Sequence, residues 1–494
     1  MTNIFLNPKH LIFIFGFISC SLTSTAQFTK PNILFIAVDD FRAELGHFEK
    51  STIITPNLDK LASQGVSFSN HFVQVPTCGA SRAAFLTGKR PGRIAELGNN
   101  IMQDEFSVKQ ETELPETFIH HLRRNGYYTV GMGKISHSVD GYVYGYEEEV
   151  SDKKELPYSW DEFLFDPGKW GTGWNAFFAY ANGENRQSMN RQVKPYEAAA
   201  VDDLGYPDGL TTQLAIKKLR ELKNSSQPFF LGVGLFKPHL PFTAPQKYWD
   251  LYDKDQISLA KNPKKPQNVA KASLQESGEF NGYELGEEKA GLDNVLSDEY
   301  ARKIKHAYYA AASYSDAQIG LILDELKALE LDQNTIVIVW GDHGWHLGEQ
   351  QVWGKHTLFE NALNSALIFK IPASNISKID DSIVESVDIY PTLMELTGIE
   401  KPAGLDGKSF AKLLKSEESQ TGNVAYSYYK NGISLRTDRY RLTQYFRGAE
   451  PTIELYDHQK DPLESINIAA ENPEIVANLM PLWQEGNTGL YNKK

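Results

Sequence analysis

Acidic and imidazole side chains follow two strongly apolar segments of the chain. The segment NILFIAV ends in Asp39-Asp40, and the segment TIVIVWG ends in Asp342-His343. Continuous apolar runs rich in β-branched residues are typical of strands buried on both faces of a parallel sheet. Because ligands bind beyond the carboxyl ends of such strands, we expect these four side chains to converge. Three carboxylates favour a hard cation such as Ca²⁺ or Mg²⁺ over Zn²⁺. Either pair alone would also suit a helix cap.

A cysteine stands at the start of a predicted helix. Cys78 opens the segment CGASRAAFLT, whose residues favour a helix that ends at Gly88. Free backbone amides and the helix dipole favour an anion at this end, and Arg82, one turn further on, adds a guanidinium to the same face. The pattern indicates an oxyanion-binding nucleophile. The alternative is a small buried cysteine that begins an ordinary helix.

The composition is that of a globular protein rather than a disordered scaffold. Of the 494 residues, 41% are apolar, 12% aromatic and 23% charged, which excludes a disordered chain. Fifty basic against 63 acidic residues give a net charge of −13. This charge gives no electrostatic basis for a nucleic-acid partner or an anionic membrane surface. An anionic substrate must therefore be bound by local basic groups.

The first 26 residues have the pattern of a secretory signal peptide. The apolar run LIFIFGFI is shorter than the ~20 residues that cross a bilayer, and a small-residue cleavage site ends at Ala26. No later segment has the pattern of a stable membrane span. We therefore expect an exported protein, periplasmic or secreted, with lipoprotein cleavage at Cys20 as the competing interpretation. After removal of the signal Cys78 is the single cysteine, so an intramolecular disulfide is excluded.

Strands and helices alternate over most of the chain, which implies a doubly wound α/β sheet. Strands are expected at residues 32–38, 128–132, 229–235 and 335–340, and helices at 58–64, 114–125, 211–222 and 297–329. Two stretches without clear periodicity, 141–208 and 254–293, are expected to be long surface insertions that shape the substrate site. The tryptophans of the first stretch either stack on sugar rings or pack into the loop's own core; they are Trp160, Trp170 and Trp174.

The chain changes character after a short predicted helix that ends at Gly398. Short, alternating, aromatic-rich runs predict an antiparallel sheet, and they lie at residues 423–429, 434–436, 440–446 and 453–456. A closing helix is expected over 471–484. The predicted organisation is a signal peptide over 1–26, a catalytic domain over 27–400 and a C-terminal subdomain over 401–494.

Several motifs together resemble the type I sulfatases of the alkaline phosphatase superfamily, and most closely the iduronate-2-sulfatase-like branch. The segment from Cys78 to Arg82, followed by Leu-Thr-Gly, is similar to the family signature, with Ala80 where proline is commoner. The resemblance runs from about Lys30 to the C-terminus. The other similar segments are PNIL before Asp39-Asp40, TPNLDKLA at 55–62, GKISH at 133–137, KPHLPF at 237–242, GDHG at 341–344 followed by LGE, RTDRY at 436–440, and ELYD at 454–457 with DP at 461–462.

The resemblance implies a fold and a maturation step. The fold is an alkaline-phosphatase-like large mixed, mostly parallel sheet flanked by helices, with a smaller C-terminal antiparallel α+β subdomain. A formylglycine-generating maturation enzyme would oxidise Cys78 to formylglycine (3-oxoalanine), whose hydrate is the nucleophile. A gem-diol supplies oxygen both to a hard cation and to sulfur, which a thiolate does poorly. The implied Ca²⁺ ligands are Asp39, Asp40, Asp342, His343 and the modified Cys78.

The resemblance also implies roles for the remaining site residues. Arg82 would hold the hydrate and the sulfate, while Lys134 and Lys355 would neutralise sulfate oxygens. His137 would remove the proton of the second hydroxyl, expelling sulfate and regenerating the aldehyde. His239 would protonate or orient the departing sugar oxygen. This division suits the chemistry, because cations stabilise charge on the sulfuryl group and imidazoles transfer protons.

The expected function is that of an exported sulfatase that cleaves sulfate esters of a sulfated carbohydrate. The iduronate-like motifs favour a 2-sulfated uronic acid, as in glycosaminoglycans, and the algal polysaccharide ulvan also combines uronic acids with sulfate. One alternative is a phosphate or phosphonate monoester hydrolase of the same superfamily, whose substrates are also tetrahedral anions. Another is an inactive sugar-binding homologue, expected if Cys78 stays unmodified.

Overall fold

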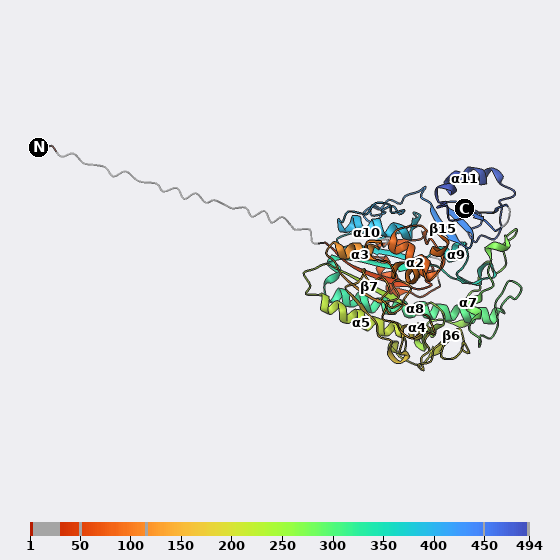
Figure 1. Ribbon diagram of the computed structural model, residues 1–494, viewed down its shortest axis with the longest axis horizontal. Coiled ribbons are helices and arrows are strands. Elements are labelled where there is room, and N and C mark those ends of the chain that lie inside the picture. The colour runs from red at the N-terminus through yellow and green to blue at the C-terminus, as the bar shows by residue number, and fades with distance from the viewer. Residues whose placement is uncertain (3–29, 49–51, 114–116, 448–449, 492–494) are drawn as a thin grey trace.

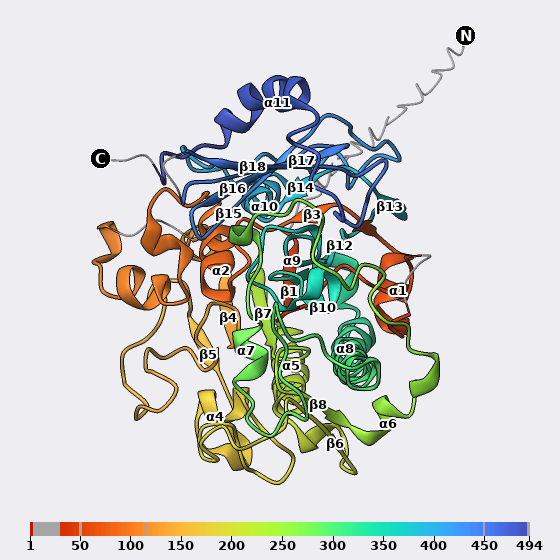
Figure 2. The same cartoon turned by 90° about the vertical axis from the view of Figure 1, so that its right-hand side faces the viewer.

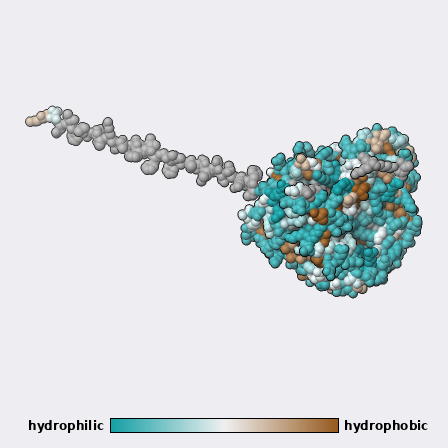
Figure 3. All heavy atoms as spheres, viewed as in Figure 1, coloured by the Kyte–Doolittle hydropathy of each residue, from teal (hydrophilic) through white to brown (hydrophobic). Residues whose placement is uncertain are grey.

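A computed structural model of the chain describes residues 1–2, 30–48, 52–113, 117–447 and 450–491. The predicted signal peptide beyond residue 2, including Cys20, lies outside the described residues. None of the helices in the described part is both long and apolar enough to cross a membrane. Figure 3 shows a mainly hydrophilic surface on which hydrophobic side chains form small, scattered areas.

Eight strands form the central sheet, in the order β13–β2–β12–β9–β1–β7–β4–β5. Strand β12 runs antiparallel to β9 and β2, and the other pairings of this sheet are parallel. The expected mixed, mostly parallel sheet is therefore confirmed. The strands are β1 (Asn32–Val38), β2 (Val66–Phe68), β4 (Tyr128–Gly133), β5 (Glu162–Leu164), β7 (Phe229–Leu235), β9 (Thr335–Gly341), β12 (Leu367–Lys370) and β13 (Lys378–Asp380).

Helices cover both faces of this sheet, which explains why β1 is apolar throughout. Leu34, Ile36 and Val38 pack among residues of α1, α5 and α8 on one face, whereas Ile33 and Phe35 pack among residues of α2, α3 and α10 on the other. Figure 1 shows α2, α3 and α10 above the sheet and α5 and α8 below it. These helices are α1 (Pro56–Ala62), α2 (Cys78–Thr87), α3 (Phe118–Arg124), α5 (Pro207–Leu222), α8 (Asp298–Ala328) and α10 (Ile389–Thr397). Their positions confirm the helices predicted from sequence.

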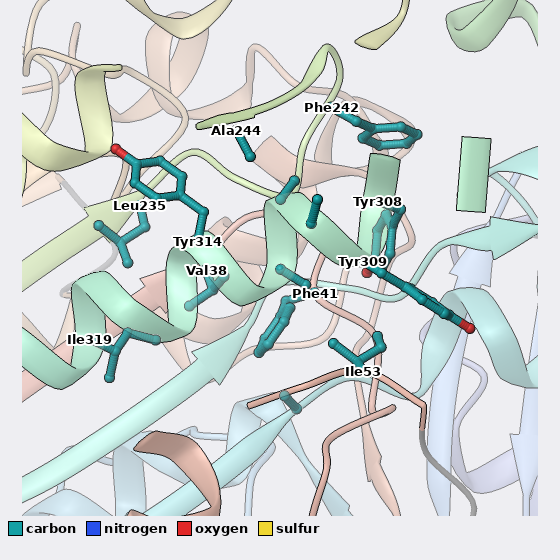
Figure 4. Close-up of a cluster of buried hydrophobic side chains, with 14 of the residues drawn as sticks. Val38, Phe41, Ile53, Leu235, Phe242, Ala244, Tyr308, Tyr309, Tyr314 and Ile319 are labelled. Atoms are coloured by element: carbon teal, nitrogen blue, oxygen red, sulfur yellow. The ribbon is translucent and has the colours of Figure 1, made fainter. Parts of the chain in front are cut away.

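The long helix α8 supports the turn that follows β1. In Figure 4, Tyr308 of α8 lies beside the apolar cluster that includes Val38 and Phe41. The Tyr308 hydroxyl donates to the backbone oxygen of Asp40 at 2.7 Å and accepts from the amide of Arg42 at 3.2 Å. The core thus fixes the backbone on which two candidate metal ligands stand.

The stretch 141–208 differs from the surface insertion expected from sequence. It carries β5, α4 (Gly173–Phe177) and β6 (Tyr196–Ala199), and β5 joins the central sheet. Trp170 and Trp174 are each 4% exposed within a separate aromatic cluster, and Trp160 packs against Phe163 and Phe230. The tryptophans therefore form core rather than a sugar platform. Elements of three to five residues are too short to show a period, which is why the sequence pattern missed them.

A second sheet of four antiparallel strands lies near the C-terminus, as predicted. Its order is β15–β16–β17–β18, and α11 packs against it through Trp483, whose indole N–H donates to the Ile433 oxygen at 3.1 Å. Figure 2 shows this sheet and α11 on one side of the molecule, beyond the central sheet. The boundary between residues 400 and 401 stays a prediction. The elements are β15 (Ala425–Tyr429), β16 (Gly432–Arg436), β17 (Tyr440–Tyr445), β18 (Thr452–Asp457) and α11 (Pro473–Glu485).

Short elements complete the fold around the carboxyl ends of the central strands. Three two-stranded pairs join β3 to β14, β6 to β8 and β10 to β11. The strands not yet placed are β3 (His71–Phe72), β8 (Phe242–Pro245), β10 (His346–Leu347), β11 (Trp353–Gly354) and β14 (Val384–Glu385). The remaining helices are α6 (Gln246–Trp249), α7 (Gly278–Asn281) and α9 (Glu360–Leu363).

Candidate active site

The ends of two adjacent parallel strands bring four polar side chains together. Strands β1 and β9 are paired in register from Asn32 with Thr335 to Val38 with Gly341, so the residues after them are neighbours. The Asp40 amide donates to Asp342 Oδ1 at 2.9 Å. Asp40 itself has a φ of 57°, which turns the chain sharply after the strand. The predicted convergence is therefore present in the structure.

Cys78 lies at the start of α2 and faces the same group. Its Sγ atom is 3.3 Å from His343 Nε2 and 3.4 Å from Lys355 Nζ. Ligand atoms of Asp39, Asp40, Cys78 and His343 all lie within 4.8 Å of one another. Burial, reinforced by the Asp39 carboxylate, raises the pKa of the Cys78 thiol to about 12. The unmodified thiol is therefore protonated and a weak nucleophile at neutral pH.

Arg82 ties helix α2 to both strand ends. Its Nε donates to Asp342 Oδ2 at 2.9 Å, and its Nη2 donates to Asp39 Oδ1 at 3.3 Å. Its Nη1 donates to the backbone oxygens of Lys134 and Ile135. The side chain is fully buried and does not line the adjoining cavity. In this arrangement Arg82 orients the carboxylates, and its contact with sulfate stays a prediction.

Two lysines face the carboxylates from opposite sides. Lys134, which follows β4, donates to Asp39 Oδ2 at 2.5 Å, and Lys355 donates to Asp40 Oδ1 at 3.0 Å. Although burial lowers the pKa of each ammonium, Asp39 beside Lys134 and Asp40 beside Lys355 raise it above its ordinary value. Both side chains are therefore charged at neutral pH.

Two histidines complete the predicted set. Burial lowers the pKa of His137 well below its ordinary value, with Lys134 adding to the effect, and its Nδ1 has no hydrogen-bond partner among the described residues. His239 donates from Nδ1 to the Leu240 oxygen at 2.6 Å, and its Nε2 lies 3.1 Å from Glu279 Oε1. Burial and then Lys355 lower the pKa of His239 to about 3, although both ring nitrogens face acceptors. The Asp39 and Glu279 carboxylates oppose this lowering and favour a second proton on the ring.

These groups open onto a cavity of about 210 Å³. Its walls combine residues predicted from sequence with residues that the sequence did not single out, mainly from the two aperiodic stretches. The lining residues are Cys78, Asn99, Lys134, His137, Tyr146, Phe177, Phe178, Arg186, His239, Glu279, Lys355 and His356. Glu279 and Arg186 are the charged residues missed, because no periodic pattern or motif marks them.

The donor set fits a hard divalent cation. Burial raises the pKa of Asp40 and Asp342, and the nearby charge of Asp39 raises both further. Such crowding of carboxylates is relieved by a cation, and oxygen ligands are those that Ca²⁺ prefers. The His343 nitrogen and the Cys78 sulfur are the exceptions, and the thiol is the softer of the two. An oxygen-bearing side chain at position 78 would complete a hard-ligand set.

The chain is similar to known proteins over most of its length. The family model described as Sulfatase matches residues 31–399, and the model described as N-sulphoglucosamine sulphohydrolase, C-terminal, matches residues 348–485. A sulfatase of Formosa agariphila is 33% identical over 89% of this chain and 83% of its own length. The iduronate 2-sulfatase of Homo sapiens is 30% identical over 91% of this chain and 93% of its own length. A solved phosphonate monoester hydrolase of Agrobacterium radiobacter superposes with a TM-score of 0.71 at 21% identity, covering 93% and 95% of the two chains.

Proposed function

This chain belongs to the sulfatase family, as a type I sulfatase of the alkaline phosphatase superfamily that hydrolyses sulfate esters, and on that premise we propose an exported, Ca²⁺-dependent enzyme with formylglycine at position 78. Its substrate is a sulfated poly- or oligosaccharide that contains uronic acid. The observation that carries the proposal is the convergence of Asp39, Asp40, Cys78 and His343 within 4.8 Å at the end of a cavity lined with cations.

The metal and the modified residue each supply one element of the chemistry. Ca²⁺ held by Asp39, Asp40, Asp342, His343 and the modified Cys78 supplies positive charge beside the sulfate group. The hydrated formylglycine supplies an oxygen nucleophile in place of the protonated thiol. A formylglycine-generating maturation enzyme is therefore a required partner, and Ala80 is the residue of its recognition motif that departs from the commoner proline.

The other residues bind the sulfate and handle protons. Lys134 and Lys355 line the cavity as charged ammonium groups, and such preorganised cations stabilise charge that develops on sulfate oxygens. His137 lines the cavity as a neutral imidazole that can accept a proton. His239 Nε2 lies on the side of Glu279, where it orients the departing sugar oxygen.

A uronic acid fits the relatives and the charge of the cavity. The 30% identical human relative is named iduronate 2-sulfatase, and its matched region covers nearly all of both chains. The cavity wall holds Lys134, Arg186 and Lys355 against a single acidic residue, Glu279. A glycosaminoglycan or ulvan fragment carries both carboxylates and sulfates, which are the groups that lysine and arginine side chains bind.

The test combines mass spectrometry with sulfate release. The protein is made with a formylglycine-generating enzyme, and the peptide spanning residues 77–89 is expected to be lighter by about 18 Da, the difference between cysteine and formylglycine. Sulfate release from heparan and ulvan fragments is then expected to require Ca²⁺ and to be lost in Cys78→Ala. Full conversion without release from any sulfate ester, but with release from phosphate or phosphonate esters, would overturn the proposal. Unconverted cysteine would favour a sugar-binding protein without turnover.

A further inference from the structure

Arg186 lines the cavity that contains Cys78, and it comes from the aperiodic stretch 141–208. Its guanidinium carbon lies 3.6 Å from the centroid of the Phe178 ring and 5.5 Å from that of Tyr283. Its backbone is fixed by hydrogen bonds at both the amide, to Phe178, and the carbonyl, from Arg191. The aromatic contacts hold the side chain in place and leave its Nε–H able to bind a ligand.

Arg186 differs from the other cations of the cavity in lacking an acidic partner. Lys134 is paired with Asp39, and Lys355 is paired with both Asp40 and Glu279. No carboxylate of the described residues lies within 4.0 Å of the Arg186 guanidinium. The Nε atom of Arg186 is buried, and no described residue accepts a hydrogen bond from it. A desolvated donor without an acceptor is unfavourable unless a ligand supplies one.

The position of Arg186 relates it to the sugar rather than to the sulfate. Phe178, on which Arg186 stacks, lies with its ring centroid 6.3 Å from that of His239. Phe177 lies between these residues and the lysine of the site. Its ring centroid is 4.5 Å from that of His239 and 4.3 Å from Lys134 Nζ. Arg186 is therefore separated by one aromatic side chain from the residue placed beside the departing sugar oxygen.

We propose that Arg186 forms an anion subsite for a second negatively charged group on the sugar that carries the scissile sulfate. This inference rests on the proposed function, because it names what that site selects. A carboxylate and a second sulfate offer the same chemistry, two oxygens that accept a bidentate pair of hydrogen bonds from one guanidinium. The subsite thus selects sugars with two anionic groups over sugars that carry only the cleaved sulfate.

The test compares matched substrates in matched variants. Wild type, Arg186→Gln and Arg186→Lys are assayed for kcat and KM on a 2-sulfated uronate oligosaccharide and its carboxyl-reduced form, and on a disulfated hexosamine and its monosulfated form. Arg191→Gln is the control, because Arg191 lies on the same stretch, is exposed and does not line the cavity. Loss of a charge-assisted pair predicts a 10- to 100-fold lower kcat/KM for Arg186→Gln on the doubly charged member of a pair, on the order of the energy of such a bond. The lysine variant is expected to recover part of this loss.

The pattern across the pairs decides the outcome. A larger loss on the uronate than on its reduced form assigns the subsite to a carboxylate, and a larger loss on the disulfated sugar assigns it to a second sulfate. An equal loss on both members of each pair would overturn the subsite and make Arg186 a structural part of the wall. If the wild-type, formylglycine-bearing enzyme releases no sulfate from any substrate, the proposed function itself fails.

Discussion

Glu279 is the acidic residue of the cavity wall, and it connects the two sides of the site. Its Oε1 lies 3.1 Å from Lys355 Nζ and 3.1 Å from His239 Nε2, while its Oε2 has no hydrogen-bond partner among the described residues. A carboxylate that faces an imidazole stabilises the protonated ring. Glu279, which contacts His239 Nε2, is thus the positioning residue that favours a proton on that nitrogen, and the Asp39 charge adds to its effect.

Replacing Glu279 with glutamine tests this dependence. We expect Glu279→Gln to lower kcat for sugar sulfates by roughly 100-fold or more, because one general-acid contribution is worth about 10²- to 10⁴-fold. The loss should be much smaller for an aryl sulfate, because a phenolate departs without a proton. Steady-state kinetics on both substrate types check this difference. Equal losses of kcat on both substrate types would show that Glu279 acts only through Lys355. The control variant is Glu284→Gln, because Glu284 is an exposed carboxylate in the same stretch, 254–293.

Asp40 is the residue that links metal binding to stability. Its carboxylate is fully buried beside Asp39, so a cation bound there stabilises the folded state. Ca²⁺ at one hundred times its dissociation constant should raise the free energy of unfolding by about 2.7 kcal/mol. We expect Asp40→Asn to lose most of the resulting rise in Tm, whereas the exposed Asp324→Asn keeps it. Thermal unfolding in Ca²⁺ and in chelator measures the rise in Tm for the wild type and the two variants. An unchanged Tm in the wild type would contradict a Ca²⁺ site.

The sequence located the residues that follow long, regular elements. Asp39 and Asp342 were recognisable because each ends a strand of seven residues whose apolar run is continuous. Cys78 was recognisable from the helix that it opens. Glu279 was not, since α7 has four residues and depends on tertiary contacts rather than on periodicity. The roles assigned to the site residues themselves remain predictions.

A buried carboxylate connects the stretch 254–293 to the C-terminal sheet. Glu454 of β18 is 1% exposed and accepts hydrogen bonds at Oε1 from the Ala270 amide and the Ser273 hydroxyl, each at 2.6 Å. Burial raises the pKa of Glu454 from 4.5 to about 7. The same stretch carries Glu279 into the active site, so this contact supports the cavity wall.

This shifted pKa makes the stability of the protein depend on pH. Between pH 4.5 and 7 the folded state binds a proton at Glu454 that the unfolded state does not, so the contribution of Glu454 to stability is complete below pH 4.5 and is lost as pH rises through 7. Relative to Glu454→Gln, which binds no proton, the wild type should lose about 3 kcal/mol of unfolding free energy over this range. Urea unfolding of both proteins at pH 5 and pH 8 gives the difference. A constant difference at the two pH values would contradict the shifted pKa.

A largely buried charge network joins helix α9 to the C-terminal sheet. Glu360, which opens α9 in the core, pairs with Arg436 and Arg441 of the C-terminal sheet, and Arg441 Nε also lies 2.5 Å from Glu464 Oε1. Glu360, His458 and Glu464 have ligand atoms close enough for a metal. The two arginines already neutralise these carboxylates, so the network is a structural set of ion pairs rather than a second metal centre.

This ion-pair network predicts that two arginines only two residues apart on the chain contribute unequally to the free energy of unfolding. Arg441 is 1% exposed, and its removal takes the guanidinium away from the buried Glu464, which keeps its contacts with His458 Nε2 and the Glu360 amide. Because a buried carboxylate then loses its cationic partner, Arg441→Met should lower the free energy of unfolding by about 3 kcal/mol. Arg439 pairs with Asp457 at 2.7 Å but is 39% exposed, and Arg439→Met should have a much smaller effect because solvent replaces the lost contact. Denaturant unfolding of the two variants makes the comparison. Equal destabilisation would mean that the C-terminal sheet is held by its apolar contacts alone. A large loss in Arg441→Met alone, with loss of sulfatase activity at temperatures where the wild type is folded, would show that the second sheet stabilises the frame of the active site.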